Sequence, residues 1–200
     1  NGVFWKQVGR ILQIWAIGYA LHLPFFSFNK LAYMIGWEEW RPFWTVDVLH
    51  SIAISLFLML LLVLIARTQR VFFLLICLVG SVAAFATPFM WSLHVDESLP
   101  LPFASYVNAR HGSLFPIFPW MSFVMFGGAL GQLYVFLKEK VADEKFFKNI
   151  FIAGIACIAL SIIANWLPVK IYPAHIYWLA SPGFVFLRLG IVLMLLAALW

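Results

Sequence analysis

The stretch Phe43–Leu56 places two ionisable side chains where an apolar helix is expected to begin. Asp47 and His50 are three residues apart, and residues at that spacing share one face of a helix. A carboxylate beside an imidazole raises its basicity and orients the ring. Such a histidine can act as a general base toward an attacking hydroxyl or amine. An Asp-x-x-His pair is short, however. The alternative interpretations are that Asp47 only complements the helix dipole and that His50 hydrogen-bonds a neighbouring helix.

A second stretch, Gly112–Gly131, begins in the same way, because Arg110 and His111 stand directly before it. We expect both helix starts to open on one side of a membrane and to share one polar site. Arg188 lies inside another apolar run, and a buried cation usually faces a partner or a wet cavity. Asp47 is the acid best placed to pair with it.

The composition points to a protein that is embedded in lipid. Hydrophobic residues make up 64% of the chain and charged residues only 10%, whereas about 25% charge is usual in soluble domains. We therefore expect a single transmembrane domain over residues 1–200, with the lipid bilayer as its surroundings. The net charge of +5 would suggest a nucleic-acid partner only in a soluble protein. Cys77 and Cys157 lie within apolar runs and are interpreted as small packed side chains.

Apolar runs of spanning length predict an all-α, polytopic transmembrane helix bundle with about six spanning helices. For the run Val48–Ala66, we expect Thr45 to cap the helix. Asp47 is expected to lie in the first turn, where the helix dipole favours a carboxylate. Arg67–Arg70 is expected to be a tight turn between antiparallel neighbours. The six runs are Val8–Phe26, Val48–Ala66, Val71–Met90, Ile117–Leu137, Phe146–Leu167 and Gly183–Trp200.

Two further features bear on packing and function. Gly127 and Gly131 have the small-xxx-small spacing that allows close approach of another helix, so we expect both to face a neighbouring helix. The Phe89–Pro116 connection is too polar to span, and long loops of this kind are often functional.

Basic residues predict the orientation in the membrane. Eight fall on the side of the chain start and four on the other, which makes the first side cytoplasmic by the positive-inside rule. The eight are Lys6, Arg10, Arg67, Arg70, Lys138, Lys140, Lys145 and Lys148, and the four are Lys30, Arg41, Arg110 and Lys170. All five histidines then fall on the outer side: His22, His50, His94, His111 and His175. The alternative is that several of them only lie in the interfacial belt among Trp and Tyr.

Common catalytic and metal motifs do not occur in the sequence. It has no His-x-x-x-His, no CxxC, no P-loop and no Gly-x-Ser-x-Gly, so no metal site is expected.

Four stretches together resemble the heparan-α-glucosaminide N-acetyltransferase family and its bacterial membrane members. In chain order they are WKQVGRILQIWAIGYALHLPF, VDVLHSIAISLFLMLLL, SLFPIFPWMSFVMFGGALG and SPGFVFLRLGIVLMLL, and they cover most of the chain. The FPIFPW…GGALG piece is the most specific. The positions that can be carried over from matching motifs are Asp47, His50, Pro119, Trp120 and Arg188.

The resemblance implies a helical bundle of a bacterial inner membrane that moves an acyl group from a coenzyme A thioester to a sugar or similar acceptor at the outer face. Acyl-CoA, with acetyl-CoA as the best-known case, is the implied co-substrate. Family members usually begin with a further helix that bears an Arg-Gly motif and a histidine. No such stretch stands within these 200 residues, so we expect the chain to be a portion of a longer one.

The sequence therefore supports two hypotheses. In the first, the protein is an acyltransferase in which His50 and Asp47 are catalytic, while His111, Arg188 and Trp120 bind the substrate. In the second, it is a non-catalytic accessory subunit that packs against other membrane subunits of a larger complex. A transporter has less support, because the chain shows neither an inverted repeat nor paired broken helices.

Overall fold

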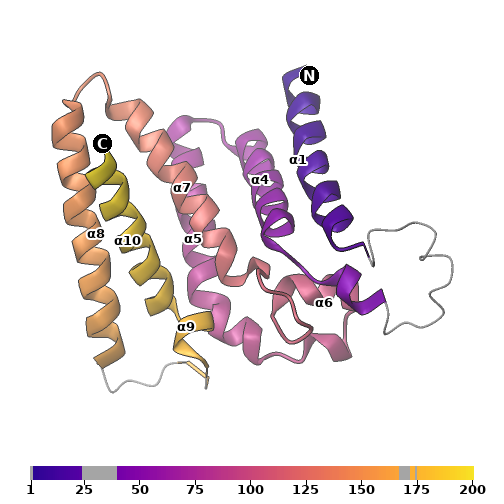
Figure 1. The fold of residues 1–200 in the computed structure, drawn as a ribbon. Helices are drawn as coiled ribbons and strands as arrows, with labels where there is room; N and C mark the ends of the chain where they lie inside the picture. Colours follow the sequence, from indigo (N-terminus) through magenta and orange to yellow (C-terminus); the bar gives the residue numbers. More distant parts are fainter. Residues whose placement is uncertain (1, 24–39, 167–171, 174) are drawn as a thin grey trace.

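The computed structural model describes residues 2–23, 40–166, 172–173 and 175–200. Within these residues the chain forms helices and no strands, so the prediction of an all-α bundle is confirmed. Successive long helices run in alternating directions and stand side by side (Figure 1). The six long helices are α1 (Gly2–Leu21), α4 (Val48–Ile65), α5 (Gln69–Ser92), α7 (Ile117–Leu137), α8 (Asp143–Trp166) and α10 (Pro182–Leu199).

In the part of the chain that the structure describes, five stretches are long and apolar enough to cross a membrane: Arg41–Ile65, which includes α4, and the helices α5, α7, α8 and α10. The remaining long helix, α1, is more polar between Gly2 and Gln13, where it carries Lys6, Gln7, Arg10 and Gln13. It begins at Gly2, six residues before the predicted start, and its predicted continuation over Pro24–Phe26 lies outside the described residues.

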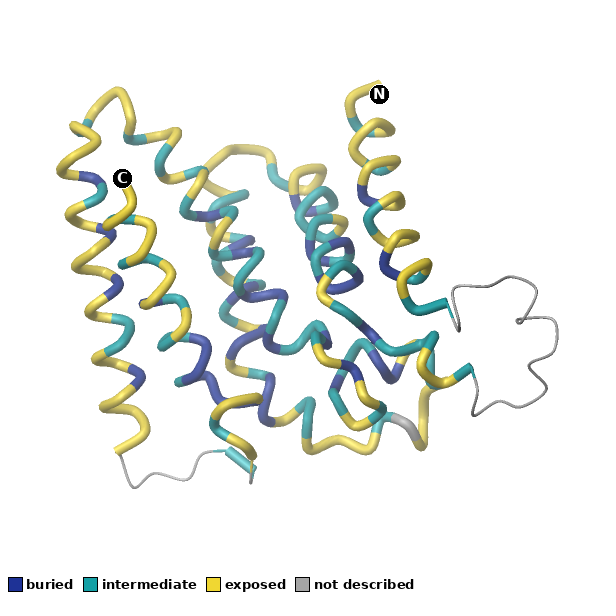
Figure 2. Tube along the Cα trace, viewed as in Figure 1, coloured by how far each residue is buried: buried dark blue, intermediate teal, exposed yellow. Residues whose placement is uncertain are grey.

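Large apolar side chains cover the outside of the bundle. Figure 2 shows long exposed stripes on the outer helices and buried residues where helices face one another. Ile65, Leu74, Leu78 and Ile163 are each more than half exposed. Water would not tolerate such a continuous apolar surface, whereas lipid does. The protein is therefore an integral membrane protein.

The best-packed part of the core lies between α4, α5 and α7. Ile76 of α5 and Met125 of α7 are fully buried there, and Leu62 of α4 packs against the same cluster. This packing explains why α5 continues to Ser92, two residues past the predicted end: the ring of Pro88 is buried inside the helix and is part of its packed face.

The prediction for the glycines of α7 is wrong. Gly127 and Gly131 are exposed, and a Cβ added to either would meet nothing within 4 Å. Gly128 between them is the packed one, against Met59 of α4. The close helix crossing lies instead between α8 and α10, where a Cβ on Gly190 would stand 2.6 Å from the carbonyl oxygen of Gly154.

The two ends of the bundle differ in character. At one end, here called the basic end, lie the start of α1, the α4–α5 turn and the α7–α8 turn. The opposite end, here called the loop end, holds the short helices η2 (Arg41–Trp44), η3 (Val95–Glu97), α6 (Leu101–Val107) and α9 (Tyr177–Ala180). The predicted grouping of the α1 start with the Arg67–Arg70 turn is confirmed, while Lys30 and Lys170 lie outside the described residues.

Candidate functional site

The start of α4 is a capping box built from the two residues that the sequence singled out. Asp47 is the N-cap, and its Oδ1 accepts a hydrogen bond from the Val48 backbone N–H at 2.6 Å. The backbone N–H of Asp47 donates to Nδ1 of His50 at 3.2 Å. The prediction that Thr45 caps this helix is therefore wrong, because the Thr45 hydroxyl donates to the carbonyl of Pro42 at the end of η2. The cap fixes the His50 ring at the helix start.

His50 is completely buried, and aromatic rings from the end of α1 and from α6 surround it. The ring centroid of Tyr19 on α1 lies 4.2 Å away, that of His22 5.7 Å and that of Tyr106 on α6 6.4 Å. Gly18 makes this packing possible, because a Cβ there would stand 2.9 Å from Cε1 and Nε2 of His50. Helix α1 thus presents its backbone to one face of the imidazole.

Side chains along one face of α1 form part of the surroundings of His50. Trp15, Gly18, Tyr19 and His22 recur at helical spacing, so they share one face. The hydroxyl of Tyr106 accepts a hydrogen bond from Nε1 of Trp15 at 3.0 Å and bonds to the hydroxyl of Tyr19 at 3.0 Å. Burial, and then the bond to Tyr19, raise the pKa of Tyr106 far above its usual range. Its hydroxyl therefore remains neutral at any physiological pH.

The loop before α7 is held against the entrance of α4. The backbone N–H of Val46 donates to Oγ of Ser113 at 3.0 Å, and the N–H of Phe115 donates to the carbonyl of Val46 at 3.3 Å. Gly112 turns the chain with φ +87°, a conformation that favours glycine. The structure thus places the two predicted helix starts side by side, and His111 lies in the loop that joins them.

Asn108 ties the same loop to the end of α5. Its side chain is fully buried, and its amide nitrogen donates to the carbonyl of Leu93 at 3.2 Å. Its Oδ1 accepts from the backbone N–H of Arg110 at 3.2 Å. The loop that carries Arg110 and His111 is therefore fixed by a buried side chain, and sequence reasoning missed this residue because a lone Asn carries no pattern.

Arg188 and Trp120 form a second cluster on α10 and α7. The guanidinium carbon of Arg188 lies 4.0 Å from the ring centroid of Phe184 and 5.1 Å from that of Trp120. Among the described residues no ion pair joins Arg188 to Asp47, whose carboxylate caps α4 instead. The expected Asp47–Arg188 pair is therefore wrong, and Arg188 is stabilised by aromatic faces.

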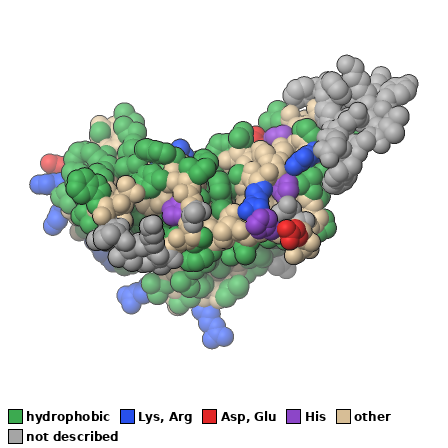
Figure 3. Space-filling view, turned by 90° about the horizontal axis from the view of Figure 1, so that it is seen from below, with side chains coloured by type: hydrophobic (Ala, Val, Ile, Leu, Met, Phe, Trp, Pro, Cys, Tyr) green, Lys and Arg blue, Asp and Glu red, His purple; other side chains and the backbone are tan. Residues whose placement is uncertain are grey.

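All five histidines lie at the loop end, as expected from the sequence. Figure 3 looks onto this end, where histidine, arginine and acidic side chains gather beside a large apolar surface. His50 Nε2, Ser51 Oγ and Ser105 Oγ are buried atoms without a hydrogen-bond partner among the described residues. Buried polar atoms normally have partners, so their occurrence around the α4 start marks this region as a candidate site.

Sequence reasoning underestimated α1. For His22 an interfacial position was the alternative interpretation, and Tyr19 and Tyr106 were not singled out, yet all three contact His50. A signal was present, because Trp15, Gly18, Tyr19 and His22 follow the i, i+3, i+4, i+7 pattern of one helix face. Tyr106 had no such signal, since only the fold of the connection after α5 brings it to α1.

Comparison with known proteins identifies the family of the chain. The chain matches the family described as Heparan-alpha-glucosaminide N-acetyltransferase, catalytic, over residues 4–169. No curated protein and no solved structure matches the chain. The matched range runs from α1 through α8, so it includes the His50 region and leaves out α10 with Arg188. Because the match covers most of its length, the chain belongs to the heparan-α-glucosaminide N-acetyltransferase family, a family of membrane acyltransferase type.

Proposed function

We propose that the protein transfers an acyl group, with acetyl the best candidate, from acyl-CoA to a hydroxyl or amine of a sugar acceptor, at a site around His50 and His22. The observation that carries this proposal is the buried His50 ring, whose Nε2 has no partner among the described residues. A buried, oriented imidazole beside a second histidine and two tyrosines can serve acid–base chemistry.

The hydrogen bonds of the two histidines give them complementary tautomers. Nδ1 of His50 accepts from a backbone N–H, so the neutral ring carries its proton on Nε2. Nδ1 of His22 faces the carbonyl of Gly18 at 3.0 Å; a carbonyl can only accept, so the His22 proton is on Nδ1 and Nε2 keeps its lone pair. His50 is then a donor toward a ligand, and His22 is an acceptor.

With these tautomers, the two histidines have different roles in the proposed reaction. The acceptor hydroxyl or amine attacks the thioester carbonyl and gives its proton to Nε2 of His22 as a general base. The negative charge that develops on the carbonyl oxygen is stabilised by the Nε2–H of His50. Collapse of the tetrahedral species breaks the carbon–sulfur bond, and the thiolate takes the proton from His22. The products are the acylated acceptor and free coenzyme A.

Asp47 acts here through position and not as a partner of the imidazolium. Its backbone N–H fixes the His50 tautomer, and its carboxylate holds the first turn of α4. His50 is fully buried beneath the Tyr19 ring. An acyl carbonyl reaches it when this ring moves aside, whereas His22 is partly exposed and meets the acceptor first.

Substrate positioning is assigned to His111, Arg188 and Trp120. Trp120 offers an apolar face to a sugar ring, and the exposed guanidinium of Arg188 lies next to it. Acyl-CoA would approach from the basic end, where Lys138, Lys140 and neighbouring lysines attract its phosphates. On the predicted topology this is the cytoplasmic side of a bacterial inner membrane, so the pantetheine arm of the donor would have to reach through the bundle for its thioester to meet His22 and His50 at the loop end.

The test uses the full-length protein in lipid nanodiscs with acetyl-CoA and glucosamine, and measures release of free thiol. His22→Ala and His50→Ala are each expected to reduce turnover by about 10² to 10³, because a general base and an oxyanion donor contribute that much. His175→Ala is the matched control: this exposed histidine lies at the same end, with its Nδ1 2.8 Å from the carbonyl of Pro173.

Two results would contradict the proposal. Full turnover in both His22→Ala and His50→Ala would remove these residues from the chemistry. If the unaltered protein releases no thiol with any amino sugar, and instead co-purifies stoichiometrically with another membrane protein, the accessory-subunit hypothesis is favoured.

A further inference from the structure

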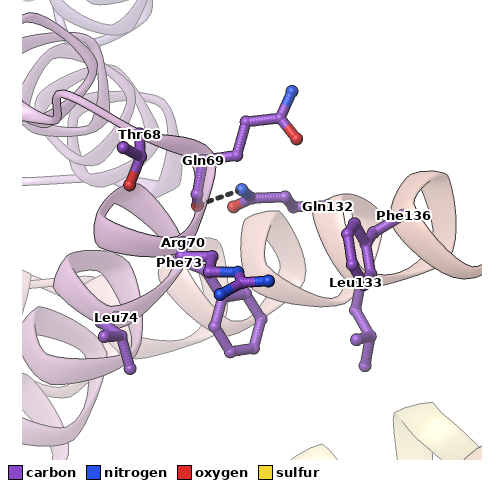
Figure 4. Close-up of a pocket in the computed structure, with 8 residues that line it drawn as sticks. All are labelled: Thr68, Gln69, Arg70, Phe73, Leu74, Gln132, Leu133 and Phe136. Carbon is purple, nitrogen blue, oxygen red and sulfur yellow. Dashed lines mark hydrogen bonds between the residues drawn. The ribbon is translucent and has the colours of Figure 1, made fainter.

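A groove of about 680 Å³ lies between α5 and α7 at the basic end, the opposite end from the histidines. Figure 4 shows it in close-up, with Arg70 and Phe73 from α5 facing Leu133 and Phe136 from α7. Its volume is within the range of small-molecule sites. The acyl-transfer site described above uses none of its residues, so the groove needs its own explanation.

The lining of the groove is amphipathic. Phe73, Leu74, Leu133 and Phe136 provide apolar walls, and Leu74 is 65% exposed. Arg70 supplies a positive charge, and Figure 4 shows its guanidinium reaching into the gap between the two helices. The residues that line the groove include no carboxylate.

A second cation borders the same groove. Nζ of Lys140, which follows α7, lies 3.8 Å from the ring centroid of Phe136. The groove also lies at the start of α5, where the helix dipole favours negative charge. Arg70 and the start of α5 therefore lie at one mouth of the groove, and Lys140 contacts Phe136 of its wall from outside the lining. The apolar walls extend from this mouth along α5 and α7.

A hydrogen bond holds the two walls together. Nε2 of Gln132 on α7 donates to the backbone carbonyl of Gln69 on α5 at 2.7 Å. Oγ1 of Thr68 caps α5 by accepting from the N–H of Val71 at 3.2 Å. Both contacts fix the first turn of α5, which carries Arg70, so the shape of the groove does not depend on a ligand.

We propose that this groove binds one anionic phospholipid of the leaflet at the basic end. Its phosphate lies between Arg70 and Lys140, and its acyl chains run along Phe73, Leu74 and Leu133. Arg70 is in the first turn of α5 and Phe136 in the last turn of α7, which is the depth of the headgroups for helices of spanning length. The two cations select a lipid with net negative charge over a zwitterionic one.

The experiment measures lipid binding to the full-length, delipidated protein in detergent, by native mass spectrometry. Phosphatidylglycerol and phosphatidylcholine with identical acyl chains are compared. We expect phosphatidylglycerol to bind more tightly, and Arg70→Gln or Lys140→Gln each to weaken it about fivefold, the effect of one cation near a membrane surface. Arg67→Gln is the matched control, because Arg67 lies just before α5, three residues from Arg70, and does not line the groove. Leu133→Trp, which fills the groove, should weaken both lipids.

Equal binding of the two lipids, or an equal loss in Arg67→Gln and Arg70→Gln, would overturn the proposal. A third outcome would also overturn it: if coenzyme A displaces phosphatidylglycerol and itself requires Arg70, the groove belongs to the thioester donor. The readout is binding and not turnover, so failure here is distinguishable from failure of the proposed transfer reaction.

Discussion

The α1–α4 and α8–α10 helix pairs solve the problem of close contact in opposite ways. Between α8 and α10, Gly154 and Gly190 bring two backbones together, as close as helices can come. Between α1 and α4, a glycine again removes a side chain, but Gly18 makes room for the imidazole of His50. The first contact is backbone on backbone. The second holds a titratable ring.

The two interfaces also differ in whether their buried polar atoms have hydrogen-bond partners. Around His50 the interface leaves a buried nitrogen and two hydroxyls, those of Ser51 and Ser105, without partners among the described residues. The α8–α10 interface satisfies its buried hydroxyl, because Oγ of Ser161 bonds to the carbonyl of Gly183 and to the hydroxyl of Tyr177. Unsatisfied polar groups are expensive, so the occurrence of two of these atoms in the first turn of α4 and one on α6 fits a site kept for a ligand and not for packing.

The largest effect is expected from Gly190→Ala. Its Cβ would stand 2.6 Å from the carbonyl oxygen of Gly154, and a backbone atom cannot turn aside. We expect a loss of about 3 kcal/mol in the free energy of unfolding, measured by thermal unfolding in detergent. Thiol release per folded molecule should stay unchanged. A melting temperature equal to that of the unaltered protein would show that the two helices do not meet at these glycines.

Gly18→Ala should destabilise less but affect activity more. Its Cβ would stand 2.9 Å from the His50 ring, which can tilt, so we expect a loss of about 1 to 2 kcal/mol. Tilting breaks the bond from the Asp47 N–H to Nδ1 and misplaces Nε2. Thiol release should then fall more than stability does. A variant that is destabilised yet fully active would separate the α1 packing from the chemistry.

Tyr106→Phe should lower stability by about 1 kcal/mol, because the hydrogen bonds to Trp15 and Tyr19 are lost. The pKa of this hydroxyl is raised in the folded state, so the folded protein resists ionisation that the unfolded chain undergoes near pH 10. Stability should therefore be independent of this group below about pH 10 and fall as the pH rises above it. In Tyr106→Phe this alkaline decline should be smaller, as measured by unfolding between pH 8 and 11. If the variant and the unaltered protein lose stability equally above pH 10, ionisation of groups other than Tyr106 causes the loss.

The smallest effect is expected from Gly127→Ala, the matched control for the other two glycines. Nothing lies within 4 Å of the added Cβ, and alanine is the better helix former by about 0.5 to 1 kcal/mol. The melting temperature should stay the same or rise slightly. A clear loss would show that α7 packs against another helix through its exposed glycines.

Much of the architecture followed from the sequence. In lipid, the backbone N–H and C=O groups of a long uncharged run find hydrogen-bond partners only when the run is helical. The number and order of the long helices were therefore predictable. The starts of α4 and α7 were recognisable because polar residues stop where apolar runs begin. The proximity of Asp47 and His50 was predictable as well, since a spacing of three residues is fixed by the helix itself. The expected contact of carboxylate and imidazole was not borne out, because the Asp47 backbone N–H bonds to the ring and the carboxylate caps α4.

What the sequence could not decide is which helices meet and through which residues. Gly127 and Gly131 have the spacing of a helix-packing motif, but they lie on the exposed face of α7. Gly154 and Gly190 belong to different helices, so no spacing in the sequence indicated that they contact each other. Arg188 contacts the rings of Phe184 and Trp120 and does not form the pair with Asp47 that its charge had suggested. Contacts between helices depend on rotation about each axis, and an apolar helix surrounded by lipid carries little sequence signal for that rotation. The tertiary structure alone therefore brought Tyr19, His22 and Tyr106 around His50.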